Sequence, residues 1–183
     1  MPRQIQHIRQ SPALLTEAAP ALLQGLSAVA DPGTRLLVLG SFPGAASLAA
    51  QQYYGHPRNQ FWTILSGLWG VDMVGMAYPR RLAELATRGL GLWDVYAACH
   101  RPGSLDSAIT AAQPNDLAGL VARLPRLVAI AHNGAESAKA VRITGALGLP
   151  VHRLPSSSPA HAAWSLARKQ VAWGAVLAAH DLL

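Results

Sequence analysis

Residues 36–62 read LLVLGSFPGAASLAAQQYYGHPRNQFW, and the rest of the fold can be worked out from this stretch. The apolar run 36–39 has the length and composition of a buried strand. Two glycines and a proline then favour a tight turn in which backbone N–H groups face a ligand. Two tyrosines, a histidine, an arginine, an asparagine, a phenylalanine and a tryptophan follow within ten residues. We interpret the stretch as a wall of an active site; an ordered loop whose aromatic rings fill a small separate core is the alternative.

Apolar runs alternate with helical patterns on both sides of this stretch. The expected strands are residues 35–39, 90–93, 126–131 and 150–154, and the expected helices are residues 11–30, 60–68, 79–87, 114–124, 134–147 and 160–183. Such alternation predicts an α/β protein in which helices cover a parallel sheet on both faces, a three-layer α/β/α sandwich. We expect residues 1–183 to form one domain, with residues 1–10 as a flexible basic arm.

The loops that leave the expected strands carry the unusual polar and aromatic residues. These loops are residues 40–59, 94–106, 132–134 and 155–161. Ligands of open parallel sheets bind outside the carboxyl ends of the strands. We therefore expect the four loops to converge on one cleft.

Composition and charge make nucleic acid the first partner to test. The 183 residues carry a net charge of +6, and 13 of the 15 basic residues are arginine. Forked guanidinium groups suit phosphate recognition. A composition rich in alanine and arginine can also follow from codon usage, so the charge by itself does not require this partner.

The single cysteine, Cys99, excludes an internal disulfide and any iron–sulfur cluster or zinc site built on cysteines. We expect no metal ion and no other cofactor. One cysteine in 183 residues fits a reducing compartment, and no stretch is long and apolar enough to span a membrane. These features predict a cytoplasmic protein.

Four segments of the chain read GSFPG at 40–44, YYGHPRNQFW at 53–62, HNG at 132–134 and LPSSSP at 154–159. Their combined order and spacing resembles the motifs of the uracil-DNA glycosylase superfamily, and most closely its hypoxanthine-DNA (deoxyinosine) glycosylase branch. The resemblance covers residues 35–178. It implies a central four-stranded parallel sheet and a monofunctional enzyme that flips a deaminated base out of DNA and cleaves its N-glycosidic bond.

The resemblance assigns roles to three residues. Asn59 takes the position that orients the attacking water, which an amide oxygen can do although it is no true general base near neutrality. Phe61 takes the position whose ring stacks on the flipped base, with a core residue of the following helix as the alternative. Asn133 is expected to read the base edge, because one amide offers a donor beside an acceptor. Asn133 can also cap the following helix.

Further residues of these loops are expected around the base and the DNA backbone. The base-binding candidates are Gly40, Ser41, Phe42 and Tyr54, and the DNA-binding candidates are Ser156, Ser157, Ser158, Arg58 and His161. The loop at residues 155–159, called the serine loop below, is expected to lead into a helix N-terminus, whose free N–H groups favour a phosphate; a plain helix cap is the alternative. Arg101 and Arg153 are candidates for backbone contacts, with solvated surface as the alternative.

The chain departs from the superfamily pattern at two positions. The first motif lacks the Asp or Asn that uracil-specific relatives use to position water, and Leu154 stands where they have a histidine. Asp94 and Asp106 are the acids nearest the expected cleft. Either acid could activate the water instead.

Three functions remain open. The leading one is a monomeric base excision repair enzyme that removes hypoxanthine from DNA containing a deaminated base, with the bacterial nucleoid as its substrate. Removal of uracil, in particular from G:U mismatches, is the runner-up, because both bases present the same donor and acceptor to Asn133. The third is a non-catalytic nucleic-acid-binding module on the same fold, which would bind DNA in a salt-dependent manner without releasing a base.

Overall fold

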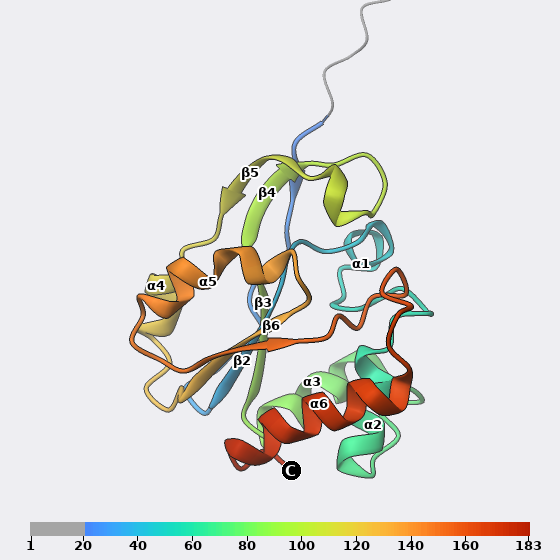
Figure 1. Ribbon diagram of the computed structural model, residues 1–183, viewed down its shortest axis with the longest axis vertical. Coiled ribbons are helices and arrows are strands. Elements are labelled where there is room, and N and C mark those ends of the chain that lie inside the picture. Colours follow the sequence, from blue (N-terminus) through green and yellow to red (C-terminus); the bar gives the residue numbers. More distant parts are fainter. Residues whose placement is uncertain (1–20) are drawn as a thin grey trace, which may run out of the picture.

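The computed structural model describes residues 21–183, and its centre is a parallel sheet of four strands (Figure 1). In chain order these are β2 (Leu36–Gly40), β3 (Leu90–Asp94), β6 (Ala129–Asn133) and β7 (Val151–Leu154). Their spatial order is β3-β2-β6-β7, and every neighbouring pair is parallel. The four predicted strands and their parallel arrangement are confirmed.

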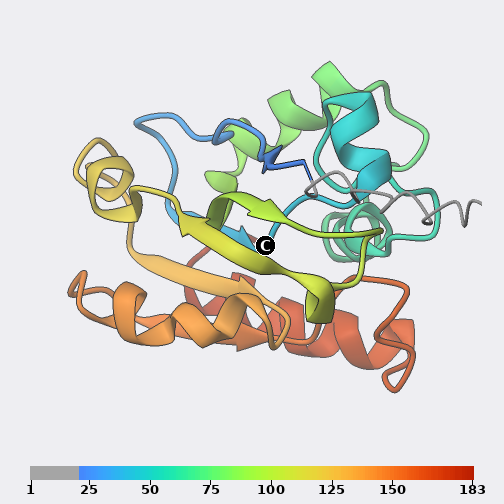
Figure 2. The same ribbon diagram turned by 90° about the horizontal axis from the view of Figure 1, so that it is seen from above.

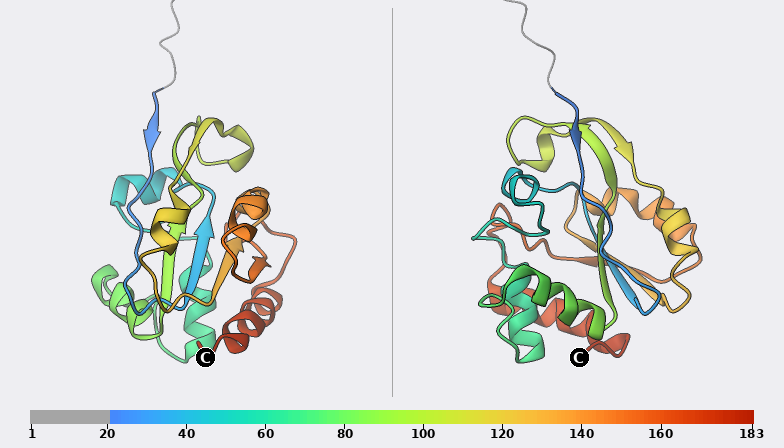
Figure 3. Two further views of the ribbon diagram at one scale, coloured as in Figure 1. Left: turned by 90° about the vertical axis from the view of Figure 1, so that its left-hand side faces the viewer. Right: turned by 180° about the vertical axis from the view of Figure 1, so that it is seen from behind.

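Helices cover both faces of this sheet (Figure 3). One face carries α2 (Phe61–Trp69), α3 (Tyr78–Thr87) and α6 (Leu166–Ala179), and the other carries α4 (Leu117–Val121) and α5 (Val141–Gly145). All five residues of β2 are buried, and alternate residues of this strand enter the two cores. The predicted three-layer sandwich is confirmed.

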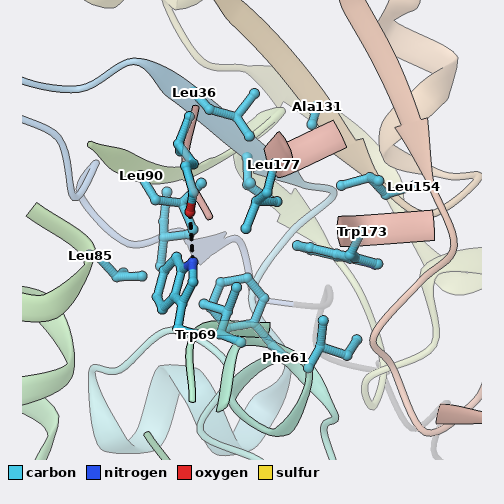
Figure 4. Close-up of a cluster of buried hydrophobic side chains, with 14 of the residues drawn as sticks. Leu36, Phe61, Trp69, Leu85, Leu90, Ala131, Leu154, Trp173 and Leu177 are labelled. Atoms are coloured by element: carbon cyan, nitrogen blue, oxygen red, sulfur yellow. Dashed lines mark hydrogen bonds between the residues drawn. The ribbon is translucent and has the colours of Figure 1, made fainter. Parts of the chain in front are cut away.

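The larger core lies between the sheet and the layer of α2, α3 and α6 (Figure 4). Phe61, Trp69 and Trp173 fill it together with aliphatic side chains of the strands. The indole Nε1 of Trp69 donates a hydrogen bond of 2.8 Å to the carbonyl oxygen of Leu182. These packed rings fix α2 and α6 against the sheet, and with them the loops that lead into both helices.

The sequence does not predict the second sheet, which is antiparallel. It contains β1 (Leu23–Gln24), β4 (Tyr96–His100) and β5 (Thr110–Pro114), in the order β1-β4-β5. β4 follows β3 after the single residue Val95, and Figure 2 looks from above onto β4 and β5. The expected loop 94–106 is therefore partly wrong. No apolar alternation marks β5, because all of its residues are exposed.

The expected helix at residues 11–30 is also wrong where the structure describes it. Residues 21–30 contain no helix, and β1 lies among them. The rest of that expected helix lies outside the described residues, as does the expected arm at residues 1–10.

The remaining helices differ from their expected bounds. A short helix α1 (Ala45–Ala50) lies inside the expected loop 40–59. The last helix begins at Leu166 rather than 160, because the Ser165 hydroxyl caps it by accepting a hydrogen bond from the Arg168 N–H at 3.3 Å. The expected helix at 134–147 is split into the 3-10 turn η2 (Ser137–Ala140) and α5, and a further 3-10 turn η1 (Asp106–Ala108) precedes β5.

Candidate active site

A cavity of about 420 Å³ opens at the carboxyl ends of the parallel strands. Residues from all four expected loops, 40–59, 94–106, 132–134 and 155–161, line it. Its volume falls in the range of small-molecule binding sites. Segments far apart in the chain therefore meet around one hollow.

The turn after β2 forms one wall of the cavity. Gly40, Ser41 and Phe42 all line it. A side-chain carbon at Gly40 would overlap the Oδ1 atom of Asp94, so only glycine lets this carboxyl group lie against the strand. The Ser41 hydroxyl donates a hydrogen bond of 2.8 Å to Asp106 Oδ1.

Arg101 is buried against this turn. Its guanidinium group donates hydrogen bonds to the carbonyl oxygens of Phe42 and Pro43 and lies 5.0 Å from the centre of the Phe42 ring. Only 1% of the Arg101 side chain is exposed. The expected contact with the DNA backbone is wrong, because the carbonyl groups of the turn already occupy this guanidinium.

The aromatic residues that line the cavity include Tyr54 but not Phe61. Tyr54 lines the cavity, and its ring stacks on Phe61 with ring centres 3.9 Å apart and 16° between the planes. Phe61 is 0% exposed and does not line the cavity. The expected stacking of a base directly on Phe61 is therefore wrong. Phe61 points into the core as the first residue of α2, and Tyr54 is the member of this stacked pair that lines the cavity.

Asn59 lines the cavity and lies two residues before the first residue of α2, whose N-cap is Gln60. Its Oδ1 accepts a hydrogen bond of 3.0 Å from the Phe61 N–H, which satisfies one of the free donors at the helix start. The amide is thereby held in one orientation. One lone pair of Oδ1 is left for a further hydrogen bond, so this geometry leaves the expected role in orienting water open.

Asn133, the last residue of β6, also lines the cavity, and the serine loop fixes its amide. Its Oδ1 accepts from the Ser157 N–H at 2.9 Å, and its Nδ2 donates to the hydroxyls of Ser157 at 2.9 Å and of Tyr54 at 3.2 Å. A flipped amide would set an N–H group against the Ser157 N–H. The donor and acceptor of Asn133 therefore keep fixed places, although both N–H groups already have partners.

The serine loop differs from its expected role at two points. Ser157 is 0% exposed and bound to Asn133, so it cannot reach a phosphate. The loop does not lead directly into a helix N-terminus, because α6 begins only at Leu166. Ser156 and Ser158 are partly exposed and line the cavity.

The expected basic contacts lie around the rim. Arg58 is exposed and lies beside the lining residues His56 and Asn59 without lining the cavity itself. His161 lines this cavity and a neighbouring one of about 700 Å³. Arg142 and Arg153 line the neighbouring cavity. Both arginines are exposed, so the expected phosphate contact of Arg153 is sterically open.

Asp94, the last residue of β3, brings a buried acid to the cavity. It is 4% exposed, and its Oδ2 is buried without a hydrogen-bond partner among residues 21–183. Burial raises the pKa of this carboxyl to about 7; the adjacent Tyr53 hydroxyl and Arg101 lower it, and Asp106 raises it further. Position alone made Asp94 a candidate in the sequence, but its depth follows from the packing of Gly40.

Lys169 is a residue of this region that the sequence does not reveal. It lies on α6, is 1% exposed, and donates to Gln60 Oε1 at 2.8 Å and to the His161 carbonyl at 3.0 Å. Burial lowers the pKa of its amine. Lys169 thus ties the loop before α2 to the loop before α6, both of which line the cavity. A lysine in an apolar helix pattern gives no hint of such a contact.

Within residues 21–183, no group of three or more His, Cys, Asp or Glu side chains is placed to hold a metal ion. None of the helices in this part of the chain is both long and apolar enough to cross a membrane.

Comparison with known proteins gives consistent matches. The family model of the Uracil DNA glycosylase superfamily matches residues 27–177. A curated protein from Methanosarcina acetivorans, named hypoxanthine DNA glycosylase, is 39% identical over 153 residues, covering 84% of this chain and 96% of that protein. A protein of the same name from Methanosarcina barkeri is 38% identical over 138 residues, covering 75% and 87%.

A solved structure is similar over almost the same length. The solution NMR structure of a Methanosarcina acetivorans protein, provisionally assigned as a uracil DNA glycosylase, superposes with a TM-score of 0.79 at 37% sequence identity. The match covers 88% of this chain and 99% of that one.

Proposed function

Because this chain belongs to the uracil DNA glycosylase superfamily, we propose that it is a monofunctional DNA glycosylase that releases hypoxanthine from DNA in base excision repair. The observation that carries the proposal is the cavity, which gathers aromatic residues, two amides and three carboxyl groups around one hollow. The two relatives named hypoxanthine DNA glycosylase support this choice of base.

In this proposal the flipped base stacks on the free face of Tyr54. Phe61 supports that ring from behind, at a distance of 3.9 Å between ring centres. Gly40, Ser41 and Phe42 bound the cavity on the side of β2. Asn133 reads the base with the free lone pair of Oδ1, which can accept from N1–H of hypoxanthine. One N–H group of Asn133 Nδ2 would have to leave its present hydroxyl partner, on Tyr54 or Ser157, and donate to the O6 atom of the base instead.

Asn59 is proposed to orient the attacking water. Its Oδ1 is fixed by the Phe61 N–H and keeps one lone pair for this water. An amide does not remove the proton in the transition state, so bond breaking runs ahead of water attack and leaves an oxocarbenium-like sugar. Substrates whose base departs easily are then favoured.

DNA is proposed to lie across the rim of the cavity. Ser156, Ser158, Arg58 and His161 are the candidates for contacts with the backbone of the damaged strand, in line with the net charge of +6. Ser157 supports Asn133 instead. We further propose that the protein acts as a monomer on chromosomal DNA in the cytoplasm.

A base-release assay tests the function. Duplex oligonucleotides carry a single hypoxanthine or a single uracil, and alkaline treatment cleaves the strand wherever a base has been released. We expect cleavage with hypoxanthine, and faster than with uracil. Faster release of uracil would favour the runner-up, and salt-sensitive binding without release of either base would favour a non-catalytic binding module.

A variant of Asn59 tests the proposed chemistry. Asn59→Ser keeps a hydroxyl that can accept a hydrogen bond from the Phe61 N–H, but this hydroxyl is too short to hold the water in the same place. We expect release of hypoxanthine to slow by at least about 10-fold while thermal unfolding stays close to that of the wild type. Unchanged release would remove Asn59 from the mechanism.

A further inference from the structure

The cavity contains a carboxyl group that the proposed function leaves unused. Asp94 is 4% exposed, lines the cavity, and has an Oδ2 atom with no hydrogen-bond partner among residues 21–183. A buried polar atom of this kind is costly unless a ligand or solvent satisfies it. Gly40 leaves room for this carboxyl group against the strand, and any side chain there would displace it. The Tyr53 hydroxyl lies beside this carboxyl group, and the cavity is the side from which a ligand can reach it.

Depth separates Asp94 from Asp106, which lines the same cavity together with Glu136. The side chain of Asp106 is 45% exposed, whereas Asp94 is 4% exposed. A flipped nucleotide enters base first, because its sugar stays attached to the DNA backbone outside. Asp94 therefore meets the base, and Asp106 is left on the side of the sugar.

The surroundings favour a proton on Asp94. Burial is the main cause that raises the pKa of this carboxyl, to about 7. The titratable groups that face it are Tyr53 and Tyr54 from the loop before α2, and Arg101 and Asp106 from the loop after β4. Near neutral pH, Asp94 can therefore supply a proton that neither tyrosine gives up, because burial raises both tyrosine pKa values above the usual range.

Asp106 has partners that favour its charged form. Its Oδ1 accepts a hydrogen bond of 2.8 Å from the Ser41 hydroxyl and lies 3.8 Å from Arg101 Nη1. Partial burial raises the pKa of Asp106, and both of these contacts act against that rise. Asp94 and Asp106 thus lie in different surroundings at one cavity, as do the two carboxyl groups that hydrolysis of a glycosidic bond uses.

We propose that Asp94 is a catalytic residue that donates a proton to the departing base, while the charged Asp106 faces the sugar. The inference rests on the proposed glycosylase function and adds the group that assists the leaving base. Neither Asn59 nor Asn133 can take this role, because an amide donates a hydrogen bond but no proton near neutrality.

The step balances in atoms and charge. The bond between C1′ and the base nitrogen breaks, and its electron pair leaves with the base. The proton of Asp94 moves to an acceptor atom of the base. The oxygen of water bonds to C1′, and one proton of this water passes to Asp106. Transfer of that proton from Asp106 to Asp94 through solvent restores the starting state.

The experiment compares rates of base release as pH changes. Asp94→Asn keeps the shape of the side chain and removes its proton donor. Asp106→Asn removes the acid proposed to face the sugar, and Asp72→Asn is the matched control, because Asp72 is exposed and does not line the cavity. Single-turnover release of hypoxanthine from duplex DNA is followed from about pH 5.5 to about pH 9, and circular dichroism reports folding.

The wild-type rate is expected to fall above about pH 7, as Asp94 loses its proton. Asp94→Asn should lower the rate by about 100-fold or more and abolish this fall. Asp106→Asn should slow release of hypoxanthine but keep the decrease in rate above about pH 7. Asp72→Asn should change neither the rate nor its pH dependence.

Two results would overturn the assignment. One is a rate for Asp94→Asn within about 3-fold of the wild type, well below the usual effect of a general acid. The other is a wild-type rate that does not fall at alkaline pH. This result would exclude Asp94 as the proton donor even if the Asp94→Asn variant does not fold. If the wild type releases no base at any pH, the glycosylase function fails, and the role of Asp94 fails with it. If the wild type is active without the pH dependence, only the role of Asp94 fails.

Discussion

Tyr54 is held in a left-handed backbone conformation, with φ of 54°, and this places its ring between the core and the cavity. Tyr54→Ala removes the surface on which a base can stack. We expect it to slow release of hypoxanthine by roughly 5- to 150-fold, which is the equivalent of one lost base–aromatic stack. Single-turnover kinetics on duplex DNA measure the effect.

Tyr54→Phe is the control for this prediction, because it keeps the ring and removes only the hydroxyl that contacts Asn133. Its rate should stay within about 3-fold of the wild type. Equal rates for Tyr54→Ala and the wild type would show that the base does not stack here.

His132 shows how one side chain couples several elements. It is 0% exposed at the end of β6, and its ring nitrogens contact the hydroxyls of Ser137 in η2 at 2.8 Å and of Thr144 in α5 at 2.9 Å. Burial lowers its pKa from 6.5 to about 4. The unfolded chain therefore binds a proton that the folded chain does not, and stability falls as pH drops from about 6.5 towards 4.

This linkage gives a measurable pH dependence. Between pH 7 and pH 5, we expect His132 to contribute a loss of about 1 to 2 kcal/mol in the free energy of unfolding. Urea titrations of the wild type and of His132→Gln at both pH values measure it. The variant should lose less stability over this interval, although it starts from a lower value. Parallel losses in both proteins would contradict the prediction.

At the scale of the elements, Lys169 joins α6 to the start of α2. Lys169→Met keeps the aliphatic stem and leaves Gln60 Oε1 and the His161 carbonyl without their donor. We expect the free energy of unfolding to fall by about 1 to 3 kcal/mol, the cost of unpaired buried groups. Binding of damaged DNA should weaken as well, because both loops line the cavity. Denaturant titration and fluorescence anisotropy measure the two effects.

The other lysine of the chain supplies the matched control. Lys139 is exposed and pairs with Glu136 on the surface, so Lys139→Met should change stability little. A similar loss in both variants would mean that the burial of Lys169 has no special effect.

Much of the element order could be predicted, and the failures have physical causes. Buried parallel strands are continuous apolar runs, so β2 and its neighbours stand out in the sequence. β5 has no such run, because none of its residues is buried. Its pairing with β4 depends on partners distant in the chain.

The sequence predicts which loops form the candidate site, but it does not predict which aromatic ring of these loops lines the cavity. Strand order places the four loops together, whichever side chains they carry. Tyr54 and Phe61 both belong to the aromatic stretch, and only the start of α2 decides which ring faces the core. The depth of Asp94 likewise depends on contacts between β2 and β3 that sequence spacing does not express.

At the scale of the whole molecule, the positive charge predicts salt-dependent DNA binding. Arg142 and Arg153 line the cavity beside the candidate site. The double change of both to glutamine should reduce the slope of log affinity against log salt by about 1 to 2, because each phosphate contact contributes about 0.9. Binding titrations over a range of salt concentrations measure the slope.

Arg80→Gln is the comparison for this prediction, since Arg80 is exposed on α3 and lines neither cavity. Its slope should match that of the wild type. If Arg80→Gln reduced the salt slope as much per charge as the changes at Arg142 and Arg153, the DNA would respond to the net charge of the protein rather than contact these two arginines.

The close approach of Gly40 and Asp94 also constrains how this enzyme can be altered. Positions 40 and 94 cannot vary independently of each other. Alanine at position 40 would collide with the Asp94 carboxyl group, and it fits only once a smaller residue such as serine replaces Asp94. Attempts to retarget the enzyme to other lesions should meet this epistasis first: a residue larger than glycine at 40 fits only when Asp94 is replaced, and that replacement removes the proposed proton donor.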